Sequence, residues 1–219
     1  MGSPDGAAPY TAPMLIADTA AVVATLLAIV TLIPQVLKLW RTRNADGVSA
    51  TWATFGAVSN GAWSAYLVSQ DLWLAVPSTA VMAFFYLMTA VLIERAGRPT
   101  SLAVVLGAAW ALFLAAAGLV GGWPGLGLVL GVSFGVQAAP SVWTAFRTWA
   151  PRGISTGTWK LILIEGLLWT VYGAGHGDRA IVVFGILSSI ASALMLGRYY
   201  TTRDRWLDPS PPAPVGSSA

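Results

Sequence analysis

The hydrophobic residues of the chain gather into seven long stretches, separated by short polar or glycine- and proline-rich segments. A helix that crosses a bilayer needs about 20 mostly apolar residues, and each stretch is close to that length. Seven consecutive apolar segments leave no polar face for water, which argues against a soluble helical bundle. The predicted spans are Leu15–Leu39, Thr51–Ser69, Leu72–Ile93, Ser101–Gly121, Leu126–Phe146, Thr158–Ala174 and Ala180–Tyr200.

Composition supports a membrane protein. Only 10% of the 219 residues are charged, whereas a soluble domain carries about 25%. The absence of cysteine and the single histidine leave little material for disulfides, thiolate zinc sites or a histidine metal site. We therefore expect no metal and no cofactor. The spans contain no enzyme motif and no paired carboxylates, so we do not expect an enzyme. A retinal protein would need a lysine in the last helix, and the only lysines are Lys38 and Lys160.

The basic residues are distributed asymmetrically between the two ends of the predicted spans. Eleven of the 12 fall on one side, and only Arg179 falls on the other. The positive-inside rule therefore predicts an outer N-terminus and a cytoplasmic C-terminus. The eleven are Lys38, Arg41, Arg43, Arg95, Arg98, Arg147, Arg152, Lys160, Arg198, Arg203 and Arg205. Membrane topology therefore accounts for the net charge of +3, and we do not expect nucleic acid as a partner.

A weak internal repeat relates the first three spans to the last three. A shift of 106 residues aligns identical residues in the two parts without a gap. The fourth span reverses the chain between the triplets, so both insert with the same orientation, related by an axis along the membrane normal. The matched pairs are Pro34/Pro140, Val36/Val142, Arg41/Arg147, Thr42/Thr148, Gly47/Gly153, Ser49/Ser155, Trp63/Trp169 and Tyr66/Tyr172.

The segment 33–49, with Pro34-Gln35 and the run RTRNADGVS after it, resembles the PQ-loop motif of the SWEET and SemiSWEET sugar transporters. The resemblance continues in Trp63-Ser-Ala-Tyr66 followed by Asp71, and in Trp169-Thr-Val-Tyr172 followed by Asp178. The second PQ motif is degraded and reads Ala-Pro-Ser at 139–141.

The resemblance implies an all-α integral membrane protein with seven transmembrane helices arranged 3+1+3. The expected units are an extracellular segment (1–14), a first three-helix repeat (15–93), a linker helix (94–122), a second repeat (123–201) and a disordered cytoplasmic tail (202–219). A cleaved signal peptide is not expected, because no basic residue precedes the first apolar run.

The resemblance also implies a substrate pocket. The family's pocket tryptophan matches Trp63 and Trp169, whose indoles can cover the apolar face of a sugar. The family's pocket asparagine falls on Ser78 and Gly185, which offer fewer hydrogen bonds, so the pocket should be larger and less polar. Either tryptophan could instead face lipid or pack within the protein.

Two further polar residues are candidate substrate ligands from their helical spacing. Asn60 lies three residues before Trp63, and Glu165 lies four before Trp169, so each shares a helix face with its tryptophan. An ionisable residue inside a span is a functional candidate, although Glu165 could also be a structural acid. Gln137 is a weaker candidate.

The family comparison assigns mechanical roles to other residues. Pro34, Gln35 and Pro140 match hinge positions, and each proline removes a helical hydrogen bond. The extracellular gate would contain four residues, which could instead form an aromatic belt with solvated charges. These are Tyr66, Asp71, Tyr172 and Asp178.

These observations predict a plasma-membrane facilitator of a small solute, a sugar or a similar compound, that works by alternating access. The alternative is a proton-coupled PQ-loop transporter of an amino acid or another zwitterionic or cationic solute that uses Glu165. A receptor is a weaker alternative, because the basic residues lie at the cytoplasmic ends of the spans. Both halves of a pore lie in one chain, so a monomer suffices, and a homo-oligomer is compatible with the sequence.

Overall fold

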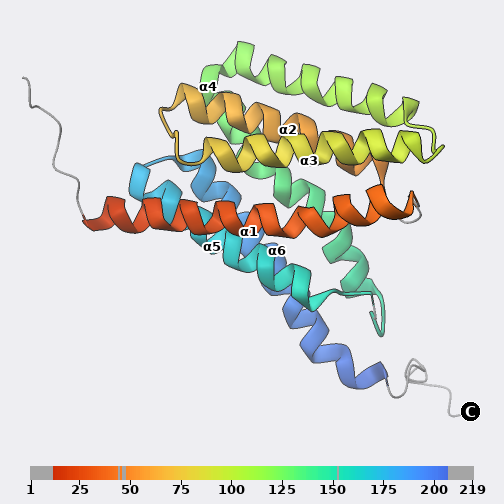
Figure 1. Cartoon of the computed structure of the whole chain (residues 1–219). Helices are drawn as coiled ribbons and strands as arrows, with labels where there is room; N and C mark the ends of the chain where they lie inside the picture. The colour runs from red at the N-terminus through yellow and green to blue at the C-terminus, as the bar shows by residue number, and fades with distance from the viewer. Residues whose placement is uncertain (1–11, 44, 46–47, 152, 207–219) are drawn as a thin grey trace, which may run out of the picture.

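The described part of the chain is built from helices (Figure 1). The computed structural model describes residues 12–206 except 44, 46–47 and 152. Most of the predicted segment 1–14 and of the predicted tail lies outside these residues, but residues 202–206 of the tail are helical. The elements are α1 (Ala12–Thr42), α2 (Ala50–Ser69), α3 (Val76–Arg95), α4 (Ser101–Arg147), α5 (Thr156–His176), α6 (Arg179–Thr202) and the 3-10 helix η1 (Arg203–Trp206).

Two predicted spans, 101–121 and 126–146, fall within the single element α4. Its backbone leaves helical geometry at Gly122, with φ 62° and ψ −163°, a conformation that is essentially restricted to glycine. The chain reverses there, so that a Cβ placed on Gly118 would lie 3.8 Å from Cβ of Leu126. We call residues 101–121 the first arm of α4 and residues 123–147 its second arm. The described helices therefore number six rather than seven by continuous assignment.

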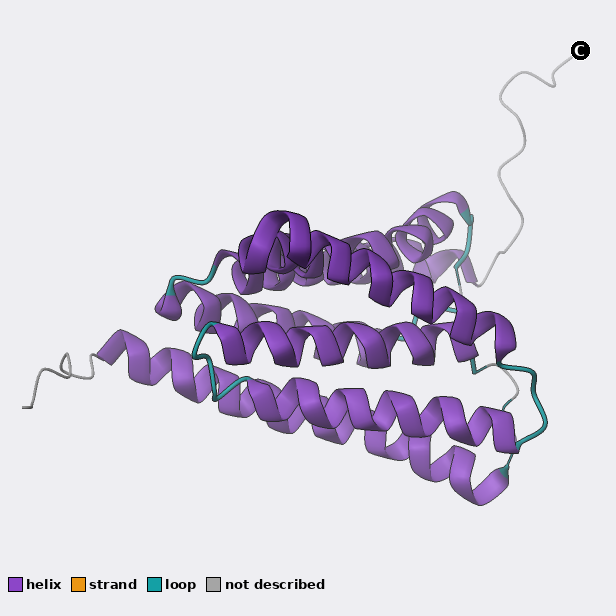
Figure 2. Cartoon of the chain, turned by 90° about the horizontal axis from the view of Figure 1, so that it is seen from above, coloured by secondary structure: helices purple, strands orange, loops and turns teal. Residues whose placement is uncertain are grey.

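The helix connections gather at two opposite ends of the molecule (Figures 1 and 2). The N-terminus of α1, the α2–α3 turn, the break at Gly122 and the α5–α6 turn lie at one end, on the left of Figure 1. We call this the outer end, and the opposite one the inner end. Basic residues such as Arg41, Arg95 and Arg147 occupy the last turns of helices that finish at the inner end.

The helices pack in the same order in the two triplets that precede and follow the first arm of α4 in the sequence. In the first triplet, α3 contacts both α1 and α2. In the second triplet, formed by the second arm of α4 with α5 and α6, α6 contacts both α4 and α5. Contacts between the triplets pair α1 with α5, and α2 with the second arm of α4, where Gly127 lies against the Tyr66 ring; these two pairs correspond under the repeat. The third helix of each triplet thus lies between the other two.

Local details also match between the triplets. Ser49 caps the N-terminus of α2 by accepting a 3.2 Å hydrogen bond from the Trp52 amide, and its repeat partner Ser155 caps α5 by accepting from Thr158 at 3.4 Å. Such caps satisfy backbone donors that a helix start leaves free. The matched serines of the sequence repeat therefore perform the same structural task.

Four helices, α1, α3, α4 and α6, are long and apolar enough to cross a membrane, which is fewer than the seven predicted spans. α2 and α5 contain polar residues such as Asn60 and Glu165. Large apolar side chains are exposed on the outside of the structure; Leu119 and Val120 are 88% and 91% exposed. Apolar helices with such surfaces indicate a multi-pass membrane protein.

Candidate functional site: a cavity between the two triplets

A cavity of about 940 Å³ lies between the two triplets. All six helices contribute to its wall, which mixes indole and phenyl rings with hydroxyl and amide groups. Pockets of this size and composition are typical of small-molecule sites. The polar wall residues include Ser59, Asn60, Ser78, Thr79, Tyr86, Ser133, Gln137, Glu165 and Ser188.

The repeat-related tryptophans both line this cavity. Trp63 is 8% exposed and Trp169 is 9% exposed. Trp63 packs edge-on against Tyr66 with 5.6 Å between ring centroids, and Trp169 packs against Tyr172 in the same way at 5.8 Å. Neither indole faces lipid, and the two sites share one geometry because the helical spacing within the motif is the same. Their role as substrate ligands stays a prediction.

The two positions that match the family's asparagine have different surroundings. Ser78 lines the cavity and is 3% exposed. Gly185 is not among the lining residues, contrary to our expectation. A Cβ there would lie 2.5 Å from the Gly166 carbonyl oxygen, so this position of α6 is pressed against α5. Close packing between two helices therefore removes Gly185 from the cavity wall.

The three polar candidates all reach the cavity. Asn60 is half-buried, and its Nδ2 donates to the Gly56 carbonyl oxygen at 2.9 Å. Glu165 is half-buried, and no basic side chain in the described part of the chain forms an ion pair with it. Pairing with Lys160 therefore does not explain this acid. Tyr86 lines the same cavity as Glu165.

The outer end is closed over the cavity by packed aromatic and aliphatic side chains. Tyr66 and Tyr172 are 5% and 1% exposed. The Tyr66 hydroxyl donates to Oδ2 of Asp178 at 2.8 Å, which joins α2 to the start of α6. Oδ1 of Asp178 accepts from the Ile181 amide at 2.9 Å and caps α6. Three of the predicted gate residues are thus part of this closure.

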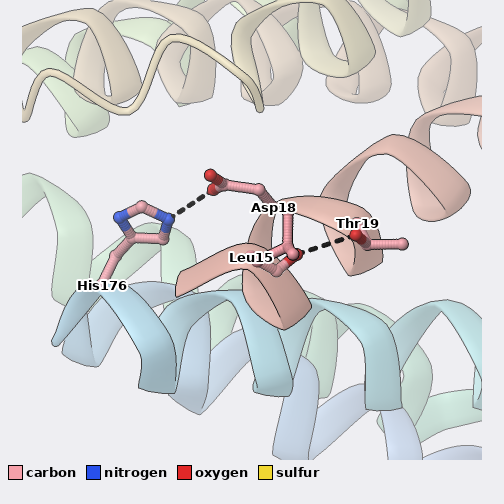
Figure 3. A network of polar contacts seen from close by, with 4 residues as sticks. All are labelled: Leu15, Asp18, Thr19 and His176. Carbon is pink, nitrogen blue, oxygen red and sulfur yellow. Dashed lines mark hydrogen bonds and ion pairs between the residues drawn. The ribbon is translucent and has the colours of Figure 1, made fainter. Parts of the chain in front are cut away.

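The fourth predicted gate residue, Asp71, is not. It is exposed in the α2–α3 turn with a φ of 57°. Asp18 of α1 instead provides a buried carboxylate at the outer end, where its Oδ1 lies 2.8 Å from Nε2 of His176 (Figure 3). Our sequence reasoning missed Asp18, although an acid inside the first predicted span was a sufficient signal.

The cavity continues to the inner end. Lys38, Thr42, Ser49, Trp52 and Thr158 form its wall near the α1–α2 connection and the start of α5. The cavity is therefore open toward the basic end of the molecule and closed toward the other.

The predicted hinge residues lie within helices. Pro34 is inside α1, and Pro140 is inside the second arm of α4, and both are exposed. The side chain of Gln35 lies outside the described part of the structure. A hinge role for these residues stays a prediction.

The PQ loop repeat family matches residues 16–76, which cover almost all of α1, α2 and the start of α3. The matched segment contains the PQ motif, Asn60, Trp63 and Tyr66. No curated protein matches the chain at a significant level. A PQ loop repeat joined to several apolar helices suggests a membrane transporter of small solutes.

Proposed function

We propose that this protein is a SWEET-like facilitator with a 3+1+3 arrangement of helices, in which the first arm of α4 links two parallel triplets. The observation that carries the proposal is the cavity walled by the repeat-related Trp63 and Trp169. It is closed at the outer end by the Tyr66–Asp178 hydrogen bond and is open at the basic inner end. Placed in the plasma membrane with its basic end in the cytoplasm, this is an inward-open transporter.

The chemistry of the wall favours an uncharged polyhydroxylated solute such as a sugar. Indoles cover apolar C–H faces, and the serine and threonine hydroxyls can both donate and accept hydrogen bonds. Among the described residues, the cavity wall contains one acid, Glu165, and one basic residue, Lys38 near the inner mouth. A single chain supplies both triplets, so a monomer is sufficient for transport.

Uptake of a panel of labelled sugars into proteoliposomes tests the proposal. Flux should saturate for at least one sugar, and Trp63→Ala with Trp169→Ala should abolish it. Trp40→Ala is the matched control, because Trp40 is 62% exposed and does not line the cavity. Flux that survives the double substitution, or a panel without any flux, contradicts the sugar proposal.

The half-buried Glu165 supports a second candidate function, proton-coupled transport of an amino acid or another zwitterionic or cationic solute. A carboxylate without a basic partner can bind an ammonium group or carry a proton. Uptake driven by an imposed pH gradient, and lost in Glu165→Gln, would favour this function. Sugar flux that is independent of the gradient and unaffected by Glu165→Gln would exclude it.

A further inference from the structure

The single histidine of the chain forms a second connection between the triplets at the outer end. His176 is the last residue of α5, and its Nε2 lies 2.8 Å from Oδ1 of Asp18 on α1. Figure 3 shows the imidazole rising from α5 toward the carboxylate. Tyr66 and Asp178 connect α2 to α6, whereas Asp18 and His176 connect α1 to α5. Separation of the triplets at this end must break both connections.

The two members of this pair differ in their access to water. Asp18 is 7% exposed, and its Oδ2 is buried without a hydrogen-bond partner among the described residues. The His176 side chain is 19% exposed and packs on the Tyr172 ring with 4.6 Å between centroids. A buried carboxylate therefore depends on an imidazole that protons in the outer solution can reach.

Among the described groups around Asp18, the His176 imidazole is the one that can serve as its cationic partner. Tyr172 of α5 packs on the His176 ring and adds no positive charge beside Asp18. Asp178 at the start of α6 is engaged by Tyr66 of α2, and the adjacent Arg179 is exposed. The described ion pairs do not join Asp18 to any basic residue except His176.

We propose that Asp18 and His176 form a proton-dependent latch that holds the outer end closed when His176 is protonated. The purpose of this latch rests on the proposed transport function, but the experiment that tests the latch does not. A charge-assisted hydrogen bond is stronger than a neutral one, and a buried carboxylate is costly without a compensating charge. Opening breaks the pair and exposes Asp18 to water, so it removes the advantage of the protonated imidazole.

The sign of the pH dependence follows. The pair carries opposite charges only while the imidazole is protonated, so acidification favours closure. The latch is strongest where the carboxyl group is ionised and the imidazole is protonated. Loss of the imidazole proton at higher pH loosens it, and the ratio of closed to open molecules should fall roughly three- to tenfold.

Distances between spin labels on Trp73→Cys and Ala174→Cys test the latch in the full chain reconstituted in lipid. The chain has no native cysteine, and both positions are exposed, one beside α3 and one on α5. The population with the longer distance should grow between pH 5 and pH 8. His176→Gln places an amide nitrogen near the position of Nε2 but does not titrate, so its distance distribution should not change with pH.

Two further variants keep the test decisive. Asp18→Asn removes the charge with little change of shape and should also remove the pH response. Tyr66→Phe loosens the other connection and should retain the response. A response in His176→Gln equal to that of the native chain, or a native chain without any response, overturns the latch. Absence of sugar flux alongside an intact pH response would contradict the transport function and leave the latch standing.

Discussion

The Tyr66 hydroxyl donates a 2.8 Å hydrogen bond to Oδ2 of Asp178, and this bond spans 112 positions of the sequence. It joins the motif of the first triplet to the residue that caps α6 in the second. Because Oδ1 of Asp178 is held by the Ile181 amide, the carboxylate is fixed in orientation. A single aspartate thus starts a helix and closes the outer end of the cavity.

Tyr66→Phe should shift the protein toward the outward-open state. A hydrogen bond to a charged group contributes about 1.5–3 kcal/mol, so the open population should rise roughly tenfold or more. Spin labels at Trp73→Cys and Ala174→Cys would show this as growth of the longer distance at constant pH. Tyr200→Phe is the control, because Tyr200 is 45% exposed at the opposite end of α6. Equal distance distributions in Tyr66→Phe and the native chain would show that the bond does not hold the closure.

The sequence can predict which side chains share a wall of the cavity where a single helix carries them. Asn60 and Glu165 lie three and four residues before their tryptophans, and the helical repeat alone places them on the same wall. The sequence could indicate Asp18 as an acid within a span but not its partner, and it could not place Gly185 correctly. Gly185 is withdrawn by the close approach of α5 to α6, and Asp18 gains its partner from a residue 158 positions away. Both positions depend on packing between helices, which the periodicity of a single helix does not predict.

Gly185→Ala should destabilise the protein, although our sequence analysis predicted a pocket residue at this position. A Cβ there would meet the Gly166 carbonyl oxygen and the Thr170 amide nitrogen at 2.5 and 2.6 Å, and backbone atoms cannot move aside cheaply. We expect a loss of about 1–3 kcal/mol, measured as a lower Tm in detergent. Gly197→Ala on the same helix has nothing within 4 Å and should be neutral or stabilising. Gly185→Asn should likewise unfold at a lower temperature and not strengthen sugar binding.

Ser49→Ala and Ser155→Ala should have similar effects, because the two serines cap α2 and α5 in the same manner. Loss of an N-cap costs about 1 kcal/mol, so each variant should melt at a slightly lower temperature than the native chain. Ser49→Asp and Ser155→Asp retain a side-chain acceptor and should preserve stability. A large loss in only one of the two alanine variants would show that the repeat partners do not have equivalent roles.

Gly122→Ala should disturb the reversal of α4, on which the proposed parallel arrangement of the two triplets depends. The φ of 62° and ψ of −163° at this residue belong to a region that alanine occupies at a cost of about 1–3 kcal/mol. The substitution should therefore lower the Tm in detergent, and it favours a continuous helix across the break, which would separate the triplets.

Gly121→Ala is a close control, because Gly121 has no positive φ and a Cβ there meets nothing within 4 Å. Alanine is a better helix former than glycine by about 1 kcal/mol, so Gly121→Ala should be neutral or stabilising. An equal loss of stability in both variants would show that the backbone conformation at Gly122 is not the reason for the turn.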